Sequence, residues 1–309
     1  MIDTMRIDVH QHLWTEPLLD ALEERTRLPF VRRELGLCMI HVAGETPSAV
    51  DLASERPEHR AALLSHDGVA RALIALSSPL GIEALPRAEA QELIDAHLDG
   101  VEALGPQFGA WGPLALDGLG PEDADAVLAR GCVGISLPAG AFAPPPSSVD
   151  LLDPVLARLE QLDAPLFIHP GPGLGSRPGS CSLADPLWWP ALTRYVAQMQ
   201  AAWLAFGALA RRAHPRLRVV FAMLAGGAPL LSERLAARGG PAIDVRDPRT
   251  FYDTSSYGPV AIEAMARRVG PQQLLYGSDR PVVEPLASGR EALLRENARW
   301  IAERAQAAV

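Results

Sequence analysis

Eight short β-rich runs, separated by longer amphipathic stretches, constrain the fold of this 309-residue chain more than any other feature of its sequence. Many runs are almost continuously apolar, such as RVVFAML at 218–224 and PLFIH at 165–169. Such runs are typical of parallel strands that are covered on both faces. The strand candidates are 6–12, 70–77, 108–115, 132–137, 165–169, 218–224, 250–254 and 273–278. Strands that alternate with helices predict either a closed barrel or a doubly wound open sheet.

The stretches between the strands carry apolar residues at helical spacing. Two of them end with Gly directly after Arg, at 130–131 and 238–239, which favours helix termination. The helix candidates are 88–104, 121–131, 153–162, 187–212, 227–240, 258–270 and 287–306. A chain that is 48% hydrophobic and 21% charged has ample material for a core, and α/β barrels of this length form one domain. We therefore expect a single domain over residues 1–309.

Two regions do not fit the repeating pattern. Residues 35–53 begin with LGLCMIHVAGE and predict an excursion after the first strand, either a small hairpin or a lid. A Pro/Gly-rich segment at 170–186 precedes the candidate helix at 187–212. Loops of this length in compact domains are usually functional or mobile.

Charge and cysteine usage exclude several classes of protein. The net charge of −9 argues against a nucleic-acid-binding protein, which would carry clustered positive charge. We therefore expect the partner to be a small-molecule substrate. We also find neither a signal peptide at the start of the chain nor an uncharged apolar run long enough for a transmembrane helix. The cysteines Cys38, Cys132 and Cys181 show no CxxC spacing, which indicates reduced thiols and a cytoplasmic protein.

Polar residues at the ends of the strand candidates carry the chemical signal. His10 and His12 are two residues apart on the first strand, so their side chains point to the same side. His169 ends the fifth run, and Asp279 follows the eighth. Each of them alone could be a satisfied polar residue at a strand end. In a barrel all four would share the C-terminal rim, where catalytic residues lie. Three imidazoles and one carboxylate suit a divalent metal, best Zn2+, with Mn2+, Fe2+ or Co2+ as alternatives.

The order DxHxH, IHP and GSD resembles the second amidohydrolase family, which is related to aminocarboxymuconate-semialdehyde decarboxylase and the benzoate-type decarboxylases. The resemblance spans nearly the whole chain and implies a (β/α)8 TIM barrel. It implies one metal ion held by His10, His12, His169 and Asp279. The family carries no carboxylated lysine on strand four, and the run CVGISLP at 132–138 has no lysine. The resemblance, together with the apolar stretch at 201–210, also predicts a homodimer.

The chain departs from this family at the end of strand six. Relatives place a His there, in a run like FAHxGG, whereas this chain has FAMLAGG with Met223 at that position. A thioether neither transfers a proton nor donates a hydrogen bond. We therefore interpret Met223 as a wall of the substrate pocket. His41, in the excursion, could replace the missing imidazole if the hairpin folds over the barrel mouth; otherwise it is a loop histidine without a catalytic role.

Five further residues are candidates near the substrate. Trp14, Trp188 and Tyr257 are expected to crowd the mouth of the barrel. Arg280 could bind a substrate carboxylate bidentately, or it could pair with Glu284 and support the loop. In relatives an Arg at the position of Arg234 reaches the active site of a neighbouring subunit; the alternative is a structural ion pair within SERLAARGG.

The remaining histidines in charged helical stretches are expected at the surface of the protein. They are His59, His66 and His97.

These features lead to three functional hypotheses. The first is a metal-dependent hydrolase of a small ester, lactone or amide, in which the metal lowers the pKa of water and Asp279 takes its proton. The second is a metal-dependent non-oxidative decarboxylase of a small aromatic or unsaturated acid. Decarboxylation requires a proton at carbon, so Met223 favours hydrolysis. The third is a barrel that has lost catalysis and binds a ligand.

Overall fold

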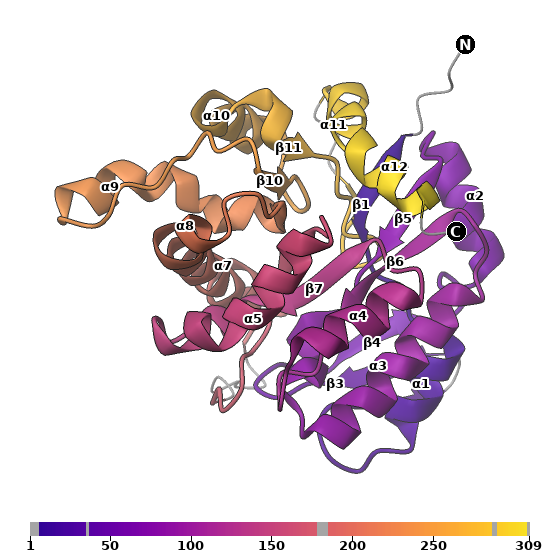
Figure 1. Ribbon diagram of the computed structural model, residues 1–309. Helices are drawn as coiled ribbons and strands as arrows, with labels where there is room; N and C mark the ends of the chain where they lie inside the picture. The colour runs from indigo at the N-terminus through magenta and orange to yellow at the C-terminus, as the bar shows by residue number, and fades with distance from the viewer. Residues whose placement is uncertain (1–5, 35–36, 178–184, 286–288, 308–309) are drawn as a thin grey trace.

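The computed structural model describes residues 6–34, 37–177, 185–285 and 289–307. Eight parallel strands form a nearly closed barrel surrounded by helices, which confirms the predicted (β/α)8 TIM barrel (Figure 1). Neighbouring strands follow the chain order throughout. The barrel strands are β1 (Ile7–Gln11), β5 (Arg71–Ile74), β6 (Phe108–Pro113), β7 (Gly134–Pro138), β8 (Leu166–His169), β9 (Val219–Phe221), β10 (Thr250–Asp253) and β11 (Leu274–Leu275).

The barrel closes between its first and last strands, at the rim where the candidate ligands lie. The backbone N–H of His12 donates to the carbonyl of Arg280 at 2.7 Å. The N–H of Asp279 donates to the carbonyl of His10 at 2.9 Å. These backbone bonds bring the DxHxH segment beside the GSD segment.

Aromatic side chains fill the barrel interior beneath this rim. Trp111 and Phe167 stack with ring centroids 5.0 Å apart, and Phe167 meets the ring of His10 edge-on at 5.1 Å. The indole N–H of Trp111 donates to the carbonyl of Val9 at 2.8 Å. The interior is therefore a packed core that supports the histidines from below.

Helices surround the barrel, and the longer ones, such as α1, α3, α5 and α10, bury an apolar face. They are α1 (Glu16–Glu23), α2 (Pro57–His66), α3 (Arg87–Glu102), α4 (Pro121–Ala129), α5 (Ser147–Gln161), α6 (Trp189–Leu192), α7 (Arg194–Ala205), α8 (Arg211–Ala213), α9 (Ser232–Ala237), α10 (Pro259–Val269), α11 (Glu291–Asn297) and α12 (Arg299–Ala307).

The single long helix predicted over 187–212 is wrong. The backbone of Thr193, at φ −119° and ψ −75°, separates α6 from α7, and a π-helical turn at Phe206–Ala210 follows α7. The apolar stretch at 201–210 was also expected to supply an exposed surface for a dimer. Instead its two aromatic side chains, Trp203 and Phe206, are buried and Leu204 is partly buried, so the stretch packs mainly into the core.

The helix predicted over 227–240 is shorter than expected because a left-handed turn precedes it. Five consecutive residues of the 3-10 segment η5 (Met223–Leu231) have positive φ: Met223, Leu224, Ala225, Gly226 and Gly227. Left-handed backbone is unfavourable for residues with a Cβ and is rare in a run. The helix begins only at Ser232, and α9 then projects from the barrel at the left of Figure 1.

The excursion after β1 is a small antiparallel sheet rather than a simple hairpin. Its strands are β2 (Phe30–Glu34), β3 (Leu37–His41) and β4 (Ser48–Asp51), so it begins earlier than the predicted range 35–53. Residues 35–36 lie outside the described residues. The sheet packs against α1.

Two smaller expectations were tested in the described part of the chain. Cys38 and Cys132 are buried free thiols, whereas Cys181 lies outside the described residues. Among the described helices, none combines the length and the apolar character that a bilayer span requires.

Candidate metal centre

Three histidines converge at the C-terminal rim of the barrel. His10 and His12 come from the end of β1, and His169 is the last residue of β8. Their ring centroids lie 4.9 to 5.0 Å apart, and the Nε2 atoms of His10 and His12 are 3.2 Å apart. All three side chains are buried, and their ligand atoms lie within 4.8 Å of one another.

The second ring nitrogen of each imidazole contacts an acceptor. Nδ1 of His12 lies 2.8 Å from the carbonyl oxygen of Ala75, and Nδ1 of His169 lies 2.9 Å from that of Pro170. A carbonyl oxygen only accepts, so Nδ1 carries the proton and Nε2 keeps its lone pair. Lone pairs that face one another in a buried site repel each other, and a divalent cation bound between them would satisfy them together. The donor chemistry therefore fits a divalent metal.

Asp253, the last residue of β10, orients His10 in the same way. Its Oδ2 atom lies 2.8 Å from Nδ1 of His10. Its Oδ1 atom accepts hydrogen bonds from the backbone N–H of Met223 at 2.9 Å and from the hydroxyl of Ser255 at 2.5 Å. Asp253 is fully buried, and both of its oxygens have partners. Oδ2 holds the metal ligand His10, and Oδ1 holds the turn after β9.

Asp279 supplies a carboxylate beside two of the three imidazoles. Its Oδ1 atom lies 3.3 Å from Nε2 of His12 and 3.7 Å from Nε2 of His10. Its Oδ2 atom accepts a hydrogen bond from the Ser256 hydroxyl at 3.1 Å. The backbone of Asp279 has a φ of 61°, a left-handed conformation that Asp tolerates better than most residues. With the three imidazoles it offers an N3O set of the kind that Zn2+ and Mn2+ accept.

The electrostatics of the site favour a cation. Burial by itself would lower the pKa of His10, but the carboxylates of Asp253 and Asp279 raise that pKa to about 9. Burial, followed by the neighbouring His10 and His12, holds the pKa of His169 well below its usual value. Burial by itself would raise the pKa of Asp279, but the hydrogen bond with His12 and the nearby imidazoles lower it to about 2. Asp279 is therefore ionised and attracts positive charge.

Asp8, the first residue of the DxHxH motif, supports the ligands from behind. Its Oδ1 atom accepts from the backbone N–H of His10 at 3.1 Å and from that of Ser278 at 3.0 Å. Its Oδ2 atom accepts from the side-chain amide of Gln11 at 2.8 Å. Asp8 thus ties the backbone that carries His10 to the backbone that precedes Asp279.

A buried ion pair extends this support. Arg60 pairs with Glu55 at 3.1 Å and donates to the side-chain oxygen of Gln11 at 2.8 Å. Glu55 in turn accepts from the backbone N–H of Trp14 at 3.1 Å. Trp14, which was expected at the barrel mouth, is buried in the core.

Two expected site residues make their side-chain contacts with residues outside the histidine cluster. The guanidinium of Arg280 pairs with Asp67 at 3.2 Å and with Glu284 at 2.7 Å, so its contacts match the alternative of a loop support. His41, at the end of β3, stacks on Phe30 with ring centroids 4.5 Å apart.

The other expected substrate contacts lie in different surroundings. Met223 is half-buried against the core and takes part in the site through its backbone N–H. Tyr257 lines a cavity of only about 10 Å3 beside Ser256. Trp188 is exposed at the start of α6. Arg234 is exposed on the projecting helix α9 and pairs with no acidic side chain of the described residues.

Sequence reasoning did not identify Asp253 as a functional residue. It lies 243 positions from His10 in the chain, within the run FYDTSS. Its position could have indicated a role, because Asp253 is at the C-terminal end of a barrel strand, as the predicted ligands are.

Solved structures with the same fold cover almost the whole chain. The 5-carboxyvanillate decarboxylase from Novosphingobium aromaticivorans, complexed with manganese and 4-hydroxy-3-methoxy-5-nitrobenzoic acid, has a TM-score of 0.65 and 18% identity, covering 96% of both chains. The 2,6-dihydroxybenzoate decarboxylase from Rhizobium has a TM-score of 0.62 and 16% identity, covering 96% of this chain and 98% of its own. The 4-oxalomesaconate hydratase from Rhodopseudomonas palustris has a TM-score of 0.66 and 15% identity, covering 98% of this chain and 97% of its own.

Sequence comparison defines the family. No curated protein sequence matches the chain. The family model described as Amidohydrolase matches residues 7–305, which include the DxHxH, IHP and GSD segments. The chain belongs to the amidohydrolase family.

Proposed function

We propose that the protein is a metal-dependent hydrolase that acts on a small-molecule ester, lactone or amide. The observation that carries this proposal is the carboxylate of Asp279 beside the imidazoles: Oδ1 lies where a ligand to the ion would, and Oδ2 accepts one hydrogen bond, from Ser256, which leaves it a second lone pair for a proton. The other carboxylate in contact with the cluster, Asp253, already serves His10, Met223 and Ser255. Asp279 is thus the group that can receive a proton beside the ligands.

His10, His12, His169 and Asp279 would hold the ion. A divalent metal bound there polarises a substrate carbonyl and lowers the pKa of water towards 7. Asp253 keeps the ring of His10 in the correct tautomer and orientation. Asp279, kept ionised by the imidazoles, accepts the proton of the attacking water. Ser256 holds the other oxygen of Asp279 and fixes the direction of the carboxylate.

Non-oxidative decarboxylation is the second candidate. Two of the three similar structures named above are decarboxylases, and one of them contains manganese. The reaction requires a donor that delivers a proton to carbon. Met223 offers none, and Asp279, with its pKa lowered to about 2, is ionised at neutral pH and carries no proton to donate. This chemistry ranks the decarboxylase below the hydrolase.

A barrel that binds a ligand without turning it over is the third candidate. The observation that favours it is the loss of the strand-six His while the metal ligands are kept. Zn2+ is our proposed resident metal, with Mn2+ as the alternative. The buried thiols of Cys38 and Cys132 support a reducing compartment, which we propose to be the cytoplasm.

One experiment separates the three candidates. The purified protein is loaded with Zn2+ or Mn2+ and tested against a panel of esters, lactones, amides and hydroxybenzoic acids. Acid release in a pH-stat reports hydrolysis, and carbon dioxide release reports decarboxylation. We expect hydrolysis that disappears on chelation. Carbon dioxide release without hydrolysis would transfer the function to the second candidate, and silence on both assays favours the third.

A further inference from the structure

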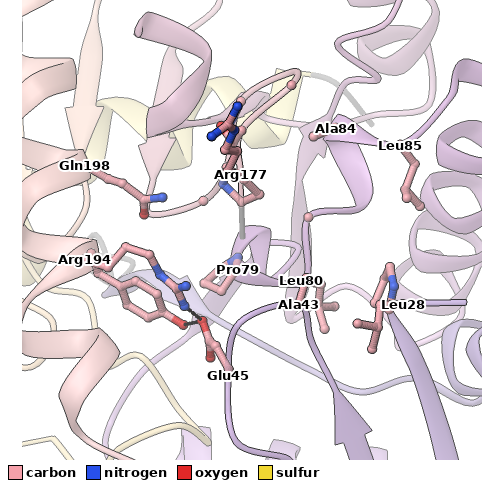
Figure 2. A pocket seen from close by; sticks show the side chains of 18 residues that line it. Leu28, Ala43, Glu45, Pro79, Leu80, Ala84, Leu85, Arg177, Arg194 and Gln198 are labelled. Atoms are coloured by element: carbon pink, nitrogen blue, oxygen red, sulfur yellow. Dashed lines mark hydrogen bonds and ion pairs between the residues drawn. The ribbon is translucent and has the colours of Figure 1, made fainter. Parts of the chain in front are cut away.

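A cavity of about 190 Å3 lies between the excursion, the loops after β5 and β8, and α7 (Figure 2). Gly171 and Pro172 form part of its lining and follow the ligand His169 by two and three residues. Two residues of extended chain span at most about 7 Å, so the loop that follows the ligand His169 supplies part of the cavity lining within that distance of His169. Ala43 and Glu45, from the loop after β3, also line the cavity.

One wall of the cavity is apolar. Leu28, Pro79, Leu80, Ala84 and Leu85 contribute to it. A dry cavity of about 150 Å3 is sufficient to bind benzene. The cavity therefore has room for a six-membered ring or a short alkyl chain with a substituent.

The opposite side of the cavity carries charged side chains, and two of them, Glu45 and Arg194, neutralise each other. The carboxylate of Glu45 forms an ion pair with Arg194 and accepts a hydrogen bond from the Tyr195 hydroxyl at 2.6 Å. These contacts, drawn as dashed lines in Figure 2, tie the excursion to α7. The negative charge of Glu45 is therefore compensated within the protein.

Arg177 is the cation that remains. It lines the cavity across from Glu45 in Figure 2 and is exposed. Within the described ranges its guanidinium makes neither an ion pair nor a hydrogen bond. A planar guanidinium at the edge of an apolar cavity matches the geometry of a carboxylate, which it binds through two parallel hydrogen bonds.

We infer that this cavity is a substrate subsite for an apolar or aromatic group that ends in a carboxylate, with Arg177 as its anchor. The substrate is then two-ended: its reacting carbonyl group lies at the metal centre, and its acidic end pairs with Arg177. This inference rests on the proposed function, because it takes the histidine cluster as the reacting end of the same molecule.

Calorimetric titration of the zinc-loaded protein tests the subsite directly. The probes are 4-ethylbenzoate and its neutral counterpart 4-ethylbenzamide. The variant R177Q should weaken binding of the benzoate about tenfold, which corresponds to about 1.4 kcal/mol for the loss of one exposed charge-assisted pair, and should leave the benzamide unchanged. The control R212Q removes an exposed positive charge on α8 and should change neither affinity.

The same titrations in the H12A background separate the cavity from the metal. If the benzoate carboxylate pairs with Arg177, its tenfold dependence on Arg177 persists without an intact ligand set. Equal effects of R177Q on both probes would overturn the inference. So would benzoate binding that depends on His12 and ignores Arg177, or an unmodified protein that binds neither probe. Turnover on the substrate panel is scored separately: binding that depends on Arg177 without turnover contradicts the proposed function alone, and turnover with binding that ignores Arg177 contradicts the subsite alone.

Discussion

The carboxylate of Asp253 holds Nδ1 of His10 at 2.8 Å, and both side chains are buried. The contact joins the end of β10 to the end of β1 across the barrel rim. It fixes which nitrogen of His10 faces the other two histidines. The same carboxylate receives the backbone N–H of Met223, so the left-handed turn after β9 and the metal ligand share one support.

Asp253→Asn should weaken zinc binding about 10- to 100-fold, because loss of an outer carboxylate typically has this effect on a metal site. The amide keeps the size of the side chain but removes the charge that orients His10. Competition with a chromogenic chelator measures the affinity. The control Asp244→Asn removes an exposed carboxylate from a loop and should leave it unchanged. Equal affinities for the Asp253 variant and the unmodified protein would show that His10 needs no such support.

The protein should contain one equivalent of divalent metal, and the double variant His10→Ala/His12→Ala should contain none. Two of the four proposed ligands are then missing, and no closed set remains. Elemental analysis after dialysis measures the content. A metal present at a thousand times its dissociation constant stabilises a fold by about 4 kcal/mol, so chelation should lower the melting temperature of the unmodified protein only. A metal-free preparation of the unmodified protein with unchanged stability argues against the site.

Asp279→Asn should retain metal and lose turnover about 100- to 10,000-fold, the range expected when a general base is removed. An amide oxygen can still ligate weakly, but it cannot take a proton. His41→Ala should change turnover little, because His41 stacks on Phe30 within the small sheet. Initial rates at saturating zinc measure both variants. An active Asp279 variant beside an inactive His41 variant would move the proton transfer to the excursion.

The stability of the fold should fall between pH 4.5 and 7 because of Glu83. This residue is fully buried, its Oε1 atom accepts from the Ser78 hydroxyl at 2.5 Å, and burial raises its pKa from 4.5 to about 7. The folded state therefore keeps a proton that the unfolded chain releases. The resulting stabilisation is complete below pH 4.5 and is lost as the pH rises through 7, a change of about 3 kcal/mol.

Glu83→Gln removes this titration and tests its size. Urea unfolding at several pH values should show that the difference in free energy of unfolding between the two proteins changes by about 3 kcal/mol across that range. Glu92→Gln, on the exposed side of α3, serves as the control and should follow the unmodified protein. Parallel curves for the Glu83 variant and the unmodified protein would contradict a neutral buried acid.

We expect a homodimer in solution, with a mass of about twice 33.1 kDa by light scattering. The buried stretch at 201–210 no longer supports this expectation. The support is now the family resemblance and an exposed apolar segment in which Leu187, Trp188, Trp189 and Leu192 are 50% to 66% exposed. Leu192→Glu should lower the dimer fraction without changing the melting temperature of dilute protein. A mass near 33.1 kDa at micromolar concentration would refute the dimer.

The fold was largely predictable because the apolar runs of buried parallel strands are local patterns. The convergence of His10, His12 and His169 followed from the same patterns, since strand ends in a barrel share one rim. The long-range partner Asp253 was not predictable in the same way, because nothing local relates it to His10. The left-handed turn at Met223 also escaped, because a run of positive φ depends on the contacts it makes and contradicts local preference.

The expectation that His97 lies at the surface is wrong, and the reason is instructive. Its side chain is buried in α3. Leu93 and Ile94 precede His97 by four and three residues and share its helical face, so the apolar pattern already placed His97 inward. The charged residues around His97 lie on the other faces of α3. The burial of a helical residue depends on the face it occupies and not on the average composition of the helix.

The proposed ligands span nearly the full length of the polypeptide, from His10 to Asp279. Backbone bonds between His10 and Asp279 close the barrel at the place where the ion would bind. During translation, His10 and His12 are therefore synthesised long before Asp279. A nascent chain can hold no complete metal site until its last barrel strand has emerged, so the metal binds late in biosynthesis. Bound metal would then indicate that the barrel has closed.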